Sequence, residues 1–309
     1  MRRLVGARPS AILAAMAATK PEVRKIAVVG SGTMGRGIAQ VAAQGGFETT
    51  LIDLNAQILG EALIAIKQSL KKGVEKGKVT EDAMVASLGR IDLDDQLERG
   101  VAGADFVIEA VPEKTDLKIG TLRRAHACTD PHAIFATNTS SLSITEIGAG
   151  CGRPDRVVGM HFFNPVPLMR LVEVIRGLET SAPTVEATHA VARAMGKETV
   201  EVRESPGFVT SRMNALIGNE AFRMLEEGVA GAEEIDRALK LGLNHPMGPF
   251  ELVDLVGLDT RLSILEYLHS TLGDRFRPSP LLRQYVKAGR LGRKAGRGVF
   301  DYRGTSARD

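Results

Sequence analysis

The stretch KIAVVGSGTMGRGIAQVAAQGG, residues 25–46, decides the fold class of this 309-residue chain. Residues 25–29 are the apolar run of a short buried strand, and residues 33–44 repeat apolar side chains with the period of a helix. The next apolar run, ETTLID, predicts a second strand that ends on Asp53. The stretch therefore predicts a strand–helix–strand unit, which is the building block of a Rossmann-type doubly wound α/β sheet.

Three glycines between the first strand and the helix predict a dinucleotide site. Gly30 permits the tight turn, Gly32 lets the backbone approach a pyrophosphate, and Gly35 lets the helix pack on the sheet. The helix begins at Thr33 and Met34, where free N–H groups and the positive end of the dipole face the phosphates. A G-x-G-x-x-G alone is weak evidence, but this one follows a strand and opens a helix.

Asp53 at the end of the second strand predicts which dinucleotide binds. A carboxylate there accepts hydrogen bonds from the ribose hydroxyls of NAD and repels the 2′-phosphate of NADP. Residues 54–56 supply no arginine to hold that phosphate. We therefore expect NAD as the cofactor.

The rest of the N-terminal two thirds alternates apolar strands with helical sequence. This alternation implies a parallel sheet with helices on both faces. The predicted long helix and the further strands span 56–78, 104–111, 133–140, 156–163, 171–177 and 198–204. A loop with Pro165 and Pro167 joins two of these strands, so the chain can fold back on itself there.

The composition changes at ESPGF, residues 204–208, and the sequence beyond it is helical in period. The predicted helices span 208–227, 232–241, 250–272 and 279–288. Pro206 with Gly207 is a suitable hinge. We expect an N-terminal extension over 1–24, an NAD-binding Rossmann domain over 25–205 and an all-α domain over 206–309.

Composition and charge exclude several classes of function. The net charge of +3 is too small to indicate nucleic-acid binding, and it is compatible with an anionic small substrate. No apolar run approaches the roughly 18 residues of a membrane span. Cys128 and Cys151 are too few for a zinc site or a disulfide framework, so we expect no metal and a reducing, cytoplasmic compartment.

The first 24 residues allow more than one interpretation. Arg2, Arg3 and Arg8 precede the apolar run AILAAMAA. The preferred interpretation is a loose extension, or a start codon placed too early with Met16 as the true start. The alternatives are a mitochondrial presequence, which would place the protein in the matrix, and a secretory signal.

The stretch HFFNPVPLMRLVE, residues 161–173, predicts the catalytic pair. If the proline loop folds the two strands together, His161 meets Glu173, which fixes the ring tautomer and stabilises the imidazolium. The other ring nitrogen can then exchange a proton with a substrate hydroxyl. Asn164 follows the first strand and can hold the nicotinamide side. The alternative is a buried histidine satisfied by a structural carboxylate, but the neighbouring NAD site favours catalysis.

The segment TNTSSLSITE, residues 137–146, follows a buried strand and therefore lies at a carboxyl end of the sheet, where open α/β sheets bind ligands. Ser143 and Glu146 fit a capping box, so we interpret Ser143 as structural. Asn138 and Ser140 then face the crevice, and Ser140 can bind a substrate hydroxyl. A serine hydrolase is disfavoured because there is no G-x-S-x-G and hydrolysis does not explain the glycine loop.

Together with these segments, SPGFV and LGLNHPMGPFELVDLVGLDT make residues 25–302 resemble the short-chain L-3-hydroxyacyl-CoA dehydrogenases, and in particular the bacterial 3-hydroxybutyryl-CoA dehydrogenases. The resemblance implies that His161 is the catalytic base, that Glu173 orients it and that Ser140 binds the substrate oxygen. It implies an NAD site lined by Asp53, Glu113, Lys118, Asn138, Ser140, Asn164 and Lys294, and coenzyme A contacts from Ser69 and Lys76. By itself, Lys76 reads as part of a solvated helix face.

One position departs from the family pattern. Many members carry an active-site asparagine before the arginine of P-G-F-x-x-N-R, and this chain has Ser211 there. Serine donates a hydrogen bond but reaches less far, and Asn214 lies one helical turn on. The fourth catalytic residue is therefore open between Ser211 and Asn214.

We expect reversible NAD-dependent oxidation of a short-chain (S)-3-hydroxyacyl-CoA to a 3-ketoacyl-CoA in fatty acid and butanoate metabolism. The rivals are a related dehydrogenase of a free hydroxy acid such as L-gulonate and a non-catalytic, crystallin-like protein. The apolar faces of the helical domain, together with the resemblance, predict a homodimer built through residues 206–309.

Overall fold

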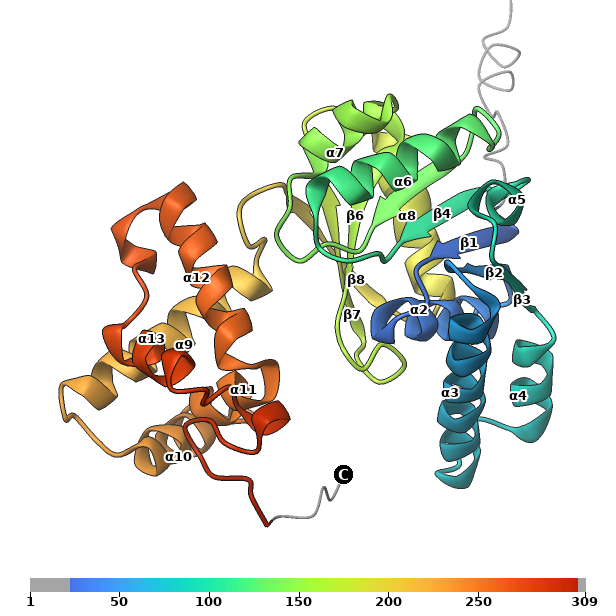
Figure 1. Ribbon diagram of the computed structural model, residues 1–309. Helices are drawn as coiled ribbons and strands as arrows, with labels where there is room; N and C mark the ends of the chain where they lie inside the picture. The colour runs from blue at the N-terminus through green and yellow to red at the C-terminus, as the bar shows by residue number, and fades with distance from the viewer. Residues whose placement is uncertain (1–22, 305–309) are drawn as a thin grey trace, which may run out of the picture.

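The computed structural model describes residues 23–304, in which a sheet domain is followed by a helical domain (Figure 1). The expectations for the first residues, including the presequence and a start at Met16, lie outside the described residues. The described part of the sheet domain has an eight-stranded sheet in the order β3-β2-β1-β4-β5-β6-β7-β8. This order reverses direction beside β1, as in a doubly wound fold, and confirms the predicted α/β class.

The strands are short and their apolar side chains are almost entirely buried at the centre of the sheet. Their bounds are β1 Lys25–Val29, β2 Glu48–Ile52, β3 Ile91–Asp94, β4 Phe106–Glu109, β5 Ile134–Thr137, β6 Val157–Phe162, β7 Leu171–Arg176 and β8 Glu198–Arg203. The pairings are parallel except that between β6 and β7, which the proline loop connects as antiparallel neighbours.

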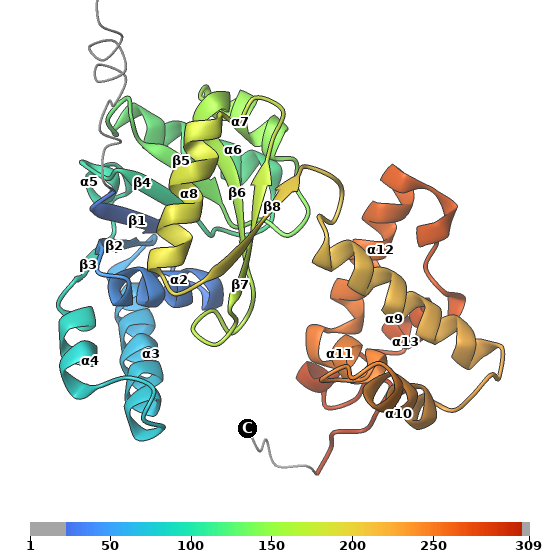
Figure 2. The ribbon, with the colours of Figure 1, turned by 180° about the vertical axis from the view of Figure 1, so that it is seen from behind.

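Helices cover both faces of the sheet (Figures 1 and 2). On one face lie α2 Thr33–Gln44, α3 Ala56–Glu75 and α8 Ala182–Ala194, with α4 Glu81–Leu88 packed beside them. On the other face lie α5 Leu97–Val101, α6 Thr115–Ala127 and α7 Ile144–Cys151. Each layer has its own hydrophobic core, and both cores share the central strands.

The helical domain packs around a third core that includes Phe222, Phe250 and Leu265. Its helices are α9 Thr210–Glu226, α10 Ala232–Gly242, α11 Pro249–Val256, α12 Leu258–Leu272 and α13 Pro280–Lys287. Three 3₁₀ turns are η1 Pro154–Arg156, which belongs to the sheet domain, η2 Asp274–Phe276 and η3 Arg293–Ala295.

One prediction from the sequence was wrong in detail, and one strand was missed. The helix expected over 250–272 is two helices, because Gly257 has φ +102° and ends α11 before α12 begins. The edge strand β3 was not predicted, since its sequence IDLD has two aspartates and only partial burial. Within residues 23–304 the structure contains no helix that is long and apolar enough to cross a bilayer.

Candidate active site

The glycine loop joins β1 to α2 and has the geometry of a phosphate cradle. Gly30 has φ +98°, and a side chain there would approach the carbonyl oxygen of Ala110 to 2.7 Å. A side chain at Gly35 would lie 1.7 Å from the carbonyl oxygen of Gly30. Gly32 is different, because no heavy atom of the described chain lies within 4 Å of the place of its Cβ. Gly30 and Gly35 are therefore packed against backbone atoms, whereas Gly32 leaves room for a pyrophosphate to approach.

The first turn of α2 lies directly behind this opening. Gly32 is its N-cap and supplies no side-chain acceptor, so the first N–H groups of the helix have no side-chain partner in the described part of the chain. Thr33 is exposed and Met34 is half-buried. Free N–H groups and the positive end of a twelve-residue helix suit a diphosphate at this position.

Asp53 lies just past β2, beside the glycine loop. Its Oδ2 accepts hydrogen bonds from the backbone N–H and the hydroxyl of Ser31, at 2.6 and 2.7 Å, and Oδ1 accepts from the N–H of Leu54 at 2.7 Å. Partial burial alone would raise the pKa of Asp53, but these hydrogen bonds hold it below its usual value. The carboxylate is thus ionised and fixed where the ribose of a dinucleotide would lie.

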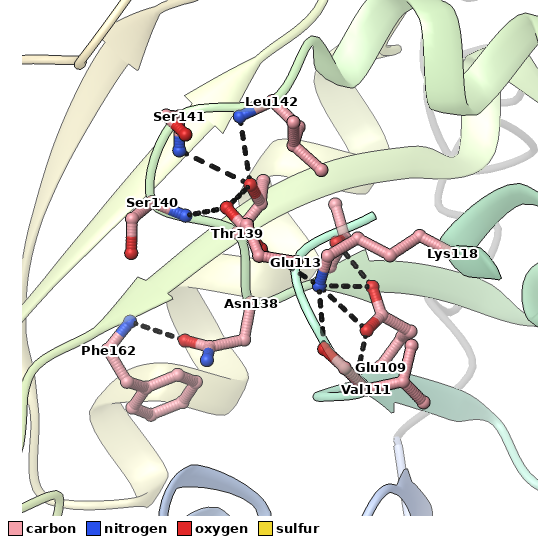
Figure 3. Close-up of polar contacts among 11 residues, drawn as sticks. Glu109, Val111, Glu113, Lys118, Asn138, Thr139, Ser140, Ser141, Leu142 and Phe162 are labelled. Carbon is pink, nitrogen blue, oxygen red and sulfur yellow. Dashed lines mark hydrogen bonds and ion pairs between the residues drawn. The ribbon is translucent and has the colours of Figure 1, made fainter. Parts of the chain in front are cut away.

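A buried charge cluster supports the loops at the carboxyl ends of β4 and β5 (Figure 3). Lys118 is fully buried, and its Nζ lies 2.9 Å from Oε1 of Glu109 and 3.3 Å from Oε2 of Glu113. Glu109 is also fully buried and accepts the hydroxyl of Thr137 at 2.6 Å. Lys118, which the resemblance placed in the NAD site, therefore contacts two carboxylates and helps to fix the position of Glu113.

Glu113 connects this cluster to the loop after β5 (Figure 3). Its Oε1 accepts hydrogen bonds from the hydroxyl of Thr139 and, at 2.9 Å, from the backbone N–H of Ser140. The Oδ1 of Asn138 accepts from the N–H of Phe162 at 3.0 Å. Ser140 itself is exposed, and within the described residues its hydroxyl forms no hydrogen bond. Asn138 and Glu113 thus fix the loop on which Ser140 is exposed. Ser143 caps α7 by accepting the N–H of Glu146, which confirms its structural role, but the return bond from the Glu146 side chain that would complete the predicted capping box is not formed among the described residues.

The proline loop folds β6 and β7 together so that His161 lies directly opposite Glu173. The Nδ1 of His161 is 2.7 Å from Oε2 of Glu173, and both side chains are buried. Within the described residues no hydrogen bond is formed by Nε2 of His161. The rings of Phe163 and Phe208 pack on the imidazole, at centroid distances of 4.5 and 5.8 Å. The arrangement leaves one ring nitrogen to accept a proton and fixes the other.

Glu173 has further partners that the sequence did not predict, and these come from the start of α9. Its Oε1 accepts the backbone N–H groups of Val209 and Thr210, at 3.3 and 3.0 Å. Its Oε2 also accepts the hydroxyl of Thr210 at 3.0 Å. Ser211 and Asn214, between which the fourth catalytic residue was left open, both lie half-buried on α9, and within the described residues neither forms a hydrogen bond to Glu173. No local sequence signal indicated Thr210, because its contact spans 37 residues.

Lys294 lies in the helical domain at η3, away from the glycine loop. Its Nζ lies 2.7 Å from Oδ1 of Asp259 at the start of α12. Among the described residues, no hydrogen bond or ion pair joins Lys294 to the other residues of the predicted NAD site.

A groove runs between α2, α3 and the proline loop. It has two adjoining parts, of about 490 and 220 Å³, that share Gln40, Ser69 and Pro165. Ser69 and Lys76 line it, as does Asn164, which is exposed. Lys197 holds the wall formed by the proline loop, because its buried ammonium donates to the carbonyl oxygens of Val166 and, at 2.8 Å, Met169.

The charged side chains in the described lining of this groove are all positive. Its cationic lining residues are Arg36, Lys72, Lys76 and Lys78, and the described lining includes no carboxylate. Such a groove suits an elongated ligand with several negative charges. Within residues 23–304 no group of three or more metal-ligating side chains lies close enough to hold an ion.

Comparison with known proteins gives matches over nearly the whole described chain. Residues 25–205 match the model of the 3-hydroxyacyl-CoA dehydrogenase NAD binding domain, and residues 207–302 match the model of the C-terminal domain of the same family. A probable 3-hydroxybutyryl-CoA dehydrogenase of Bacillus subtilis is 51% identical over 282 residues, which cover 91% of this chain and 98% of the relative.

A second relative, the 3-hydroxybutyryl-CoA dehydrogenase of Bradyrhizobium diazoefficiens, is 46% identical and covers 91% of this chain and 96% of its own length. Among solved structures, the (S)-3-hydroxybutyryl-CoA dehydrogenase of Ralstonia eutropha superposes with a TM-score of 0.88 at 44% identity, over 91% of this chain and 99% of that one. These matches confirm the resemblance seen in the sequence motifs and the predicted NAD cofactor. The chain belongs to the 3-hydroxyacyl-CoA dehydrogenase family.

Proposed function

We propose that this protein catalyses the reversible, NAD-dependent oxidation of a short-chain (S)-3-hydroxyacyl-CoA, with 3-hydroxybutyryl-CoA as the preferred substrate. The observation that carries the proposal is the His161–Glu173 pair, 2.7 Å apart and buried at the same edge of the sheet as the glycine loop. Relatives that cover the same length are named for this reaction, which supports the choice of substrate.

In the proposed mechanism His161 is the general base. Glu173 holds Nδ1 as the protonated nitrogen, so that Nε2 carries the free lone pair that removes the proton from the C3 hydroxyl. The ionised carboxylate then stabilises the imidazolium that forms. The exposed hydroxyl of Ser140 binds the same substrate oxygen and orients it. NAD, when bound, accepts the hydride that leaves C3.

The residues present fit NAD well. The open approach at Gly32 and the free N–H groups of α2 would hold the pyrophosphate, and Asp53 would hold the ribose. In this proposal, the loops that would surround the nicotinamide contain or are supported by Glu113, Lys118, Asn138 and Asn164. Lys294 belongs to the helical domain, so it would contact NAD only from that domain.

We assign the cationic groove to the coenzyme A part of the substrate. Coenzyme A carries a diphosphate and a 3′-phosphate, which are the kind of charges that Lys76 and its cationic neighbours attract. Ser69 lines both parts of the groove, and its hydroxyl, which forms no hydrogen bond within residues 23–304, can bind the pantetheine chain. A free sugar acid such as L-gulonate would leave this groove empty, which favours the acyl-CoA substrate.

The test is the absorbance of NADH formed by the purified protein with NAD and one of three substrates. 3-Hydroxybutyryl-CoA is expected to give NADH, whereas free 3-hydroxybutyrate, the matched control without coenzyme A, and L-gulonate are expected to give almost none. Equal rates with the free acid would contradict the assignment of the groove. No NADH with any substrate would favour the non-catalytic alternative.

We also infer a homodimer built through the helical domain. Many apolar side chains of α9 and α11 pack inside this domain, but Met213, Leu255 and Val256 remain exposed. Light scattering is expected to give twice the 33.1 kDa of one chain, and a dilution-independent monomer mass would refute the dimer.

A reducing compartment, the cytoplasm, is part of the proposal because Cys128 and Cys151 are both free. The mitochondrial matrix would meet the same condition.

A further inference from the structure

Thr210 is the first residue of the helical domain's first helix, yet its polar atoms contact the sheet domain. Its backbone N–H donates to Oε1 of Glu173 at 3.0 Å, and its hydroxyl donates to Oε2 at 3.0 Å. The same Oε2 accepts Nδ1 of His161 at 2.7 Å. One carboxylate oxygen is therefore shared between the catalytic imidazole and a hydroxyl from the other domain.

The hinge conformation explains how Thr210 reaches this place. Gly207 and Phe208 both have positive φ, +74° and +50°, and Phe208 is an unusual residue for this region of backbone space. Its ring is buried and packs on His161. The tight turn thus brings the Phe208 ring against the imidazole and turns the N-terminus of α9 toward Glu173. A strained residue that persists at such a site is held by its surroundings.

The electrostatics of Glu173 depend on these donors. Its side chain has no exposed surface, and burial alone would raise its pKa. The hydrogen bonds from His161 and from the N–H and hydroxyl of Thr210 lower its pKa below the usual value instead. The seventeen-residue helix α9 adds the positive end of its dipole.

Within the described residues, no other charged side chain forms a hydrogen bond or ion pair with His161 or Glu173, and several of those on the surrounding elements have partners of their own. These contacts are Arg212 with Ser205, Glu204 with Thr145, Arg176 with Glu201 and Arg170 with Glu198. His161 is therefore the ionisable partner of Glu173 among the described residues, and Thr210 is the neutral donor that shares it.

We propose that Thr210 is a positioning residue for the dehydrogenase reaction. It holds Glu173 in line with His161, and by sharing Oε2 it limits how strongly the carboxylate stabilises the protonated imidazole. The inference rests on the proposed function, and it makes the catalytic pair dependent on the docking of α9 against the sheet. Removing the hydroxyl concentrates negative charge on the oxygen that faces His161. The imidazole then binds its proton more tightly and acts as a base only at higher pH.

The experiment compares Thr210→Val, which removes the hydroxyl and keeps the branched shape, with Thr210→Ser, which keeps the hydroxyl. Thr271→Val is the matched control, because that exposed threonine of α12 bonds only to carbonyls of its own helix. We expect Thr210→Val to lower kcat about ten-fold, since it removes a hydrogen bond to a charged group. KM for both substrates should stay within about two-fold, because ground-state binding is unchanged.

The pH profile is the readout that a purely structural role would not move. In Thr210→Val the rising limb of kcat for oxidation should lie about half a pH unit higher than in the wild type. Thr210→Ser should restore both the limb and most of kcat, and Thr271→Val should match the wild type. The inference would be overturned if the rising limb of the pH profile were unshifted in Thr210→Val, or if Thr210→Ser lost as much kcat as Thr210→Val.

A second measurement separates this inference from the proposed function. NMR titration of the histidine ring nitrogens, with His161 assigned from a His161→Gln variant, reports the protonation of the imidazole without any substrate. Thr210→Val is expected to raise the midpoint for His161, and an unchanged midpoint would refute the role of Thr210. Lack of turnover by the wild type with 3-hydroxybutyryl-CoA would refute the function alone, since the titration would still decide on Thr210.

Discussion

Replacing Glu173 by glutamine exchanges one oxygen of a fully buried carboxylate for an amide nitrogen and should nearly abolish turnover. The two oxygens of Glu173 have different partners. Oε1 accepts two backbone N–H groups of α9, and Oε2 accepts His161 and the Thr210 hydroxyl. Glutamine can orient in two ways, and the structure decides between them.

If the amide nitrogen faces α9, it opposes two N–H donors and leaves both unsatisfied. Each buried unsatisfied donor costs about 1–3 kcal/mol, so this orientation is disfavoured by at least about 2 kcal/mol, or roughly thirty-fold. The glutamine therefore keeps its oxygen toward Val209 and Thr210 and donates its N–H to Nδ1 of His161. The ring must then carry its proton on Nε2, which is the nitrogen that has to accept the substrate proton.

The expected result is a kcat lower by about 10³ to 10⁴-fold, the usual cost of fixing a catalytic histidine in the wrong tautomer. The assay is NADH formation from 3-hydroxybutyryl-CoA at saturating NAD, with NAD affinity measured separately and expected to be unchanged. Glu198→Gln, an exposed glutamate of β8, is the matched control. Retention of more than about a tenth of the wild-type kcat by Glu173→Gln would refute the tautomer argument.

The other predictions concern the catalytic base, the cofactor, the buried charge pair and the loss of folding stability at low pH. His161→Gln or His161→Ala should lower kcat by about 10² to 10⁴-fold with NAD affinity near wild type, and a variant that keeps over half its turnover would exclude His161 as the base. Asp53→Ala should increase the use of NADP relative to NAD, measured as the ratio of the two kcat/KM values, because the charge that repels the 2′-phosphate is lost. Lys118→Met should lower the free energy of unfolding by about 3–5 kcal/mol in denaturant titration, since it removes the cationic partner of the buried Glu109, and a loss near zero would show that the pair contributes nothing. The folded-state pKa of Glu173 lies below its usual 4.5, so its stabilisation should be present above that pH and disappear as the pH falls through the lower folded value. The stability difference between the wild type and Glu173→Gln should shrink correspondingly on acidification, and a constant difference would contradict the pKa assignment.

The sequence by itself was enough for the glycine loop with its flanking strand and helix, and for the catalytic pair. The strand, turn and helix at residues 25–44 have the predicted bounds, because apolar period and glycine conformation are local properties of the chain. His161 and Glu173 were predicted to meet because only a short proline loop separates their strands, and the register places them opposite each other. Each of these inferences needed only neighbours within about a dozen residues.

Tertiary structure alone decided the surroundings of that pair. Thr210 reaches Glu173 through a positive φ at Phe208 that no periodicity predicts, and the contact joins residues 37 positions apart. The resemblance placed Lys118 in the NAD site, whereas the packing of α6 against β4 buries it between two carboxylates. Such contacts depend on how whole elements pack and on what burial does to charge, and a pattern read along the chain contains neither quantity.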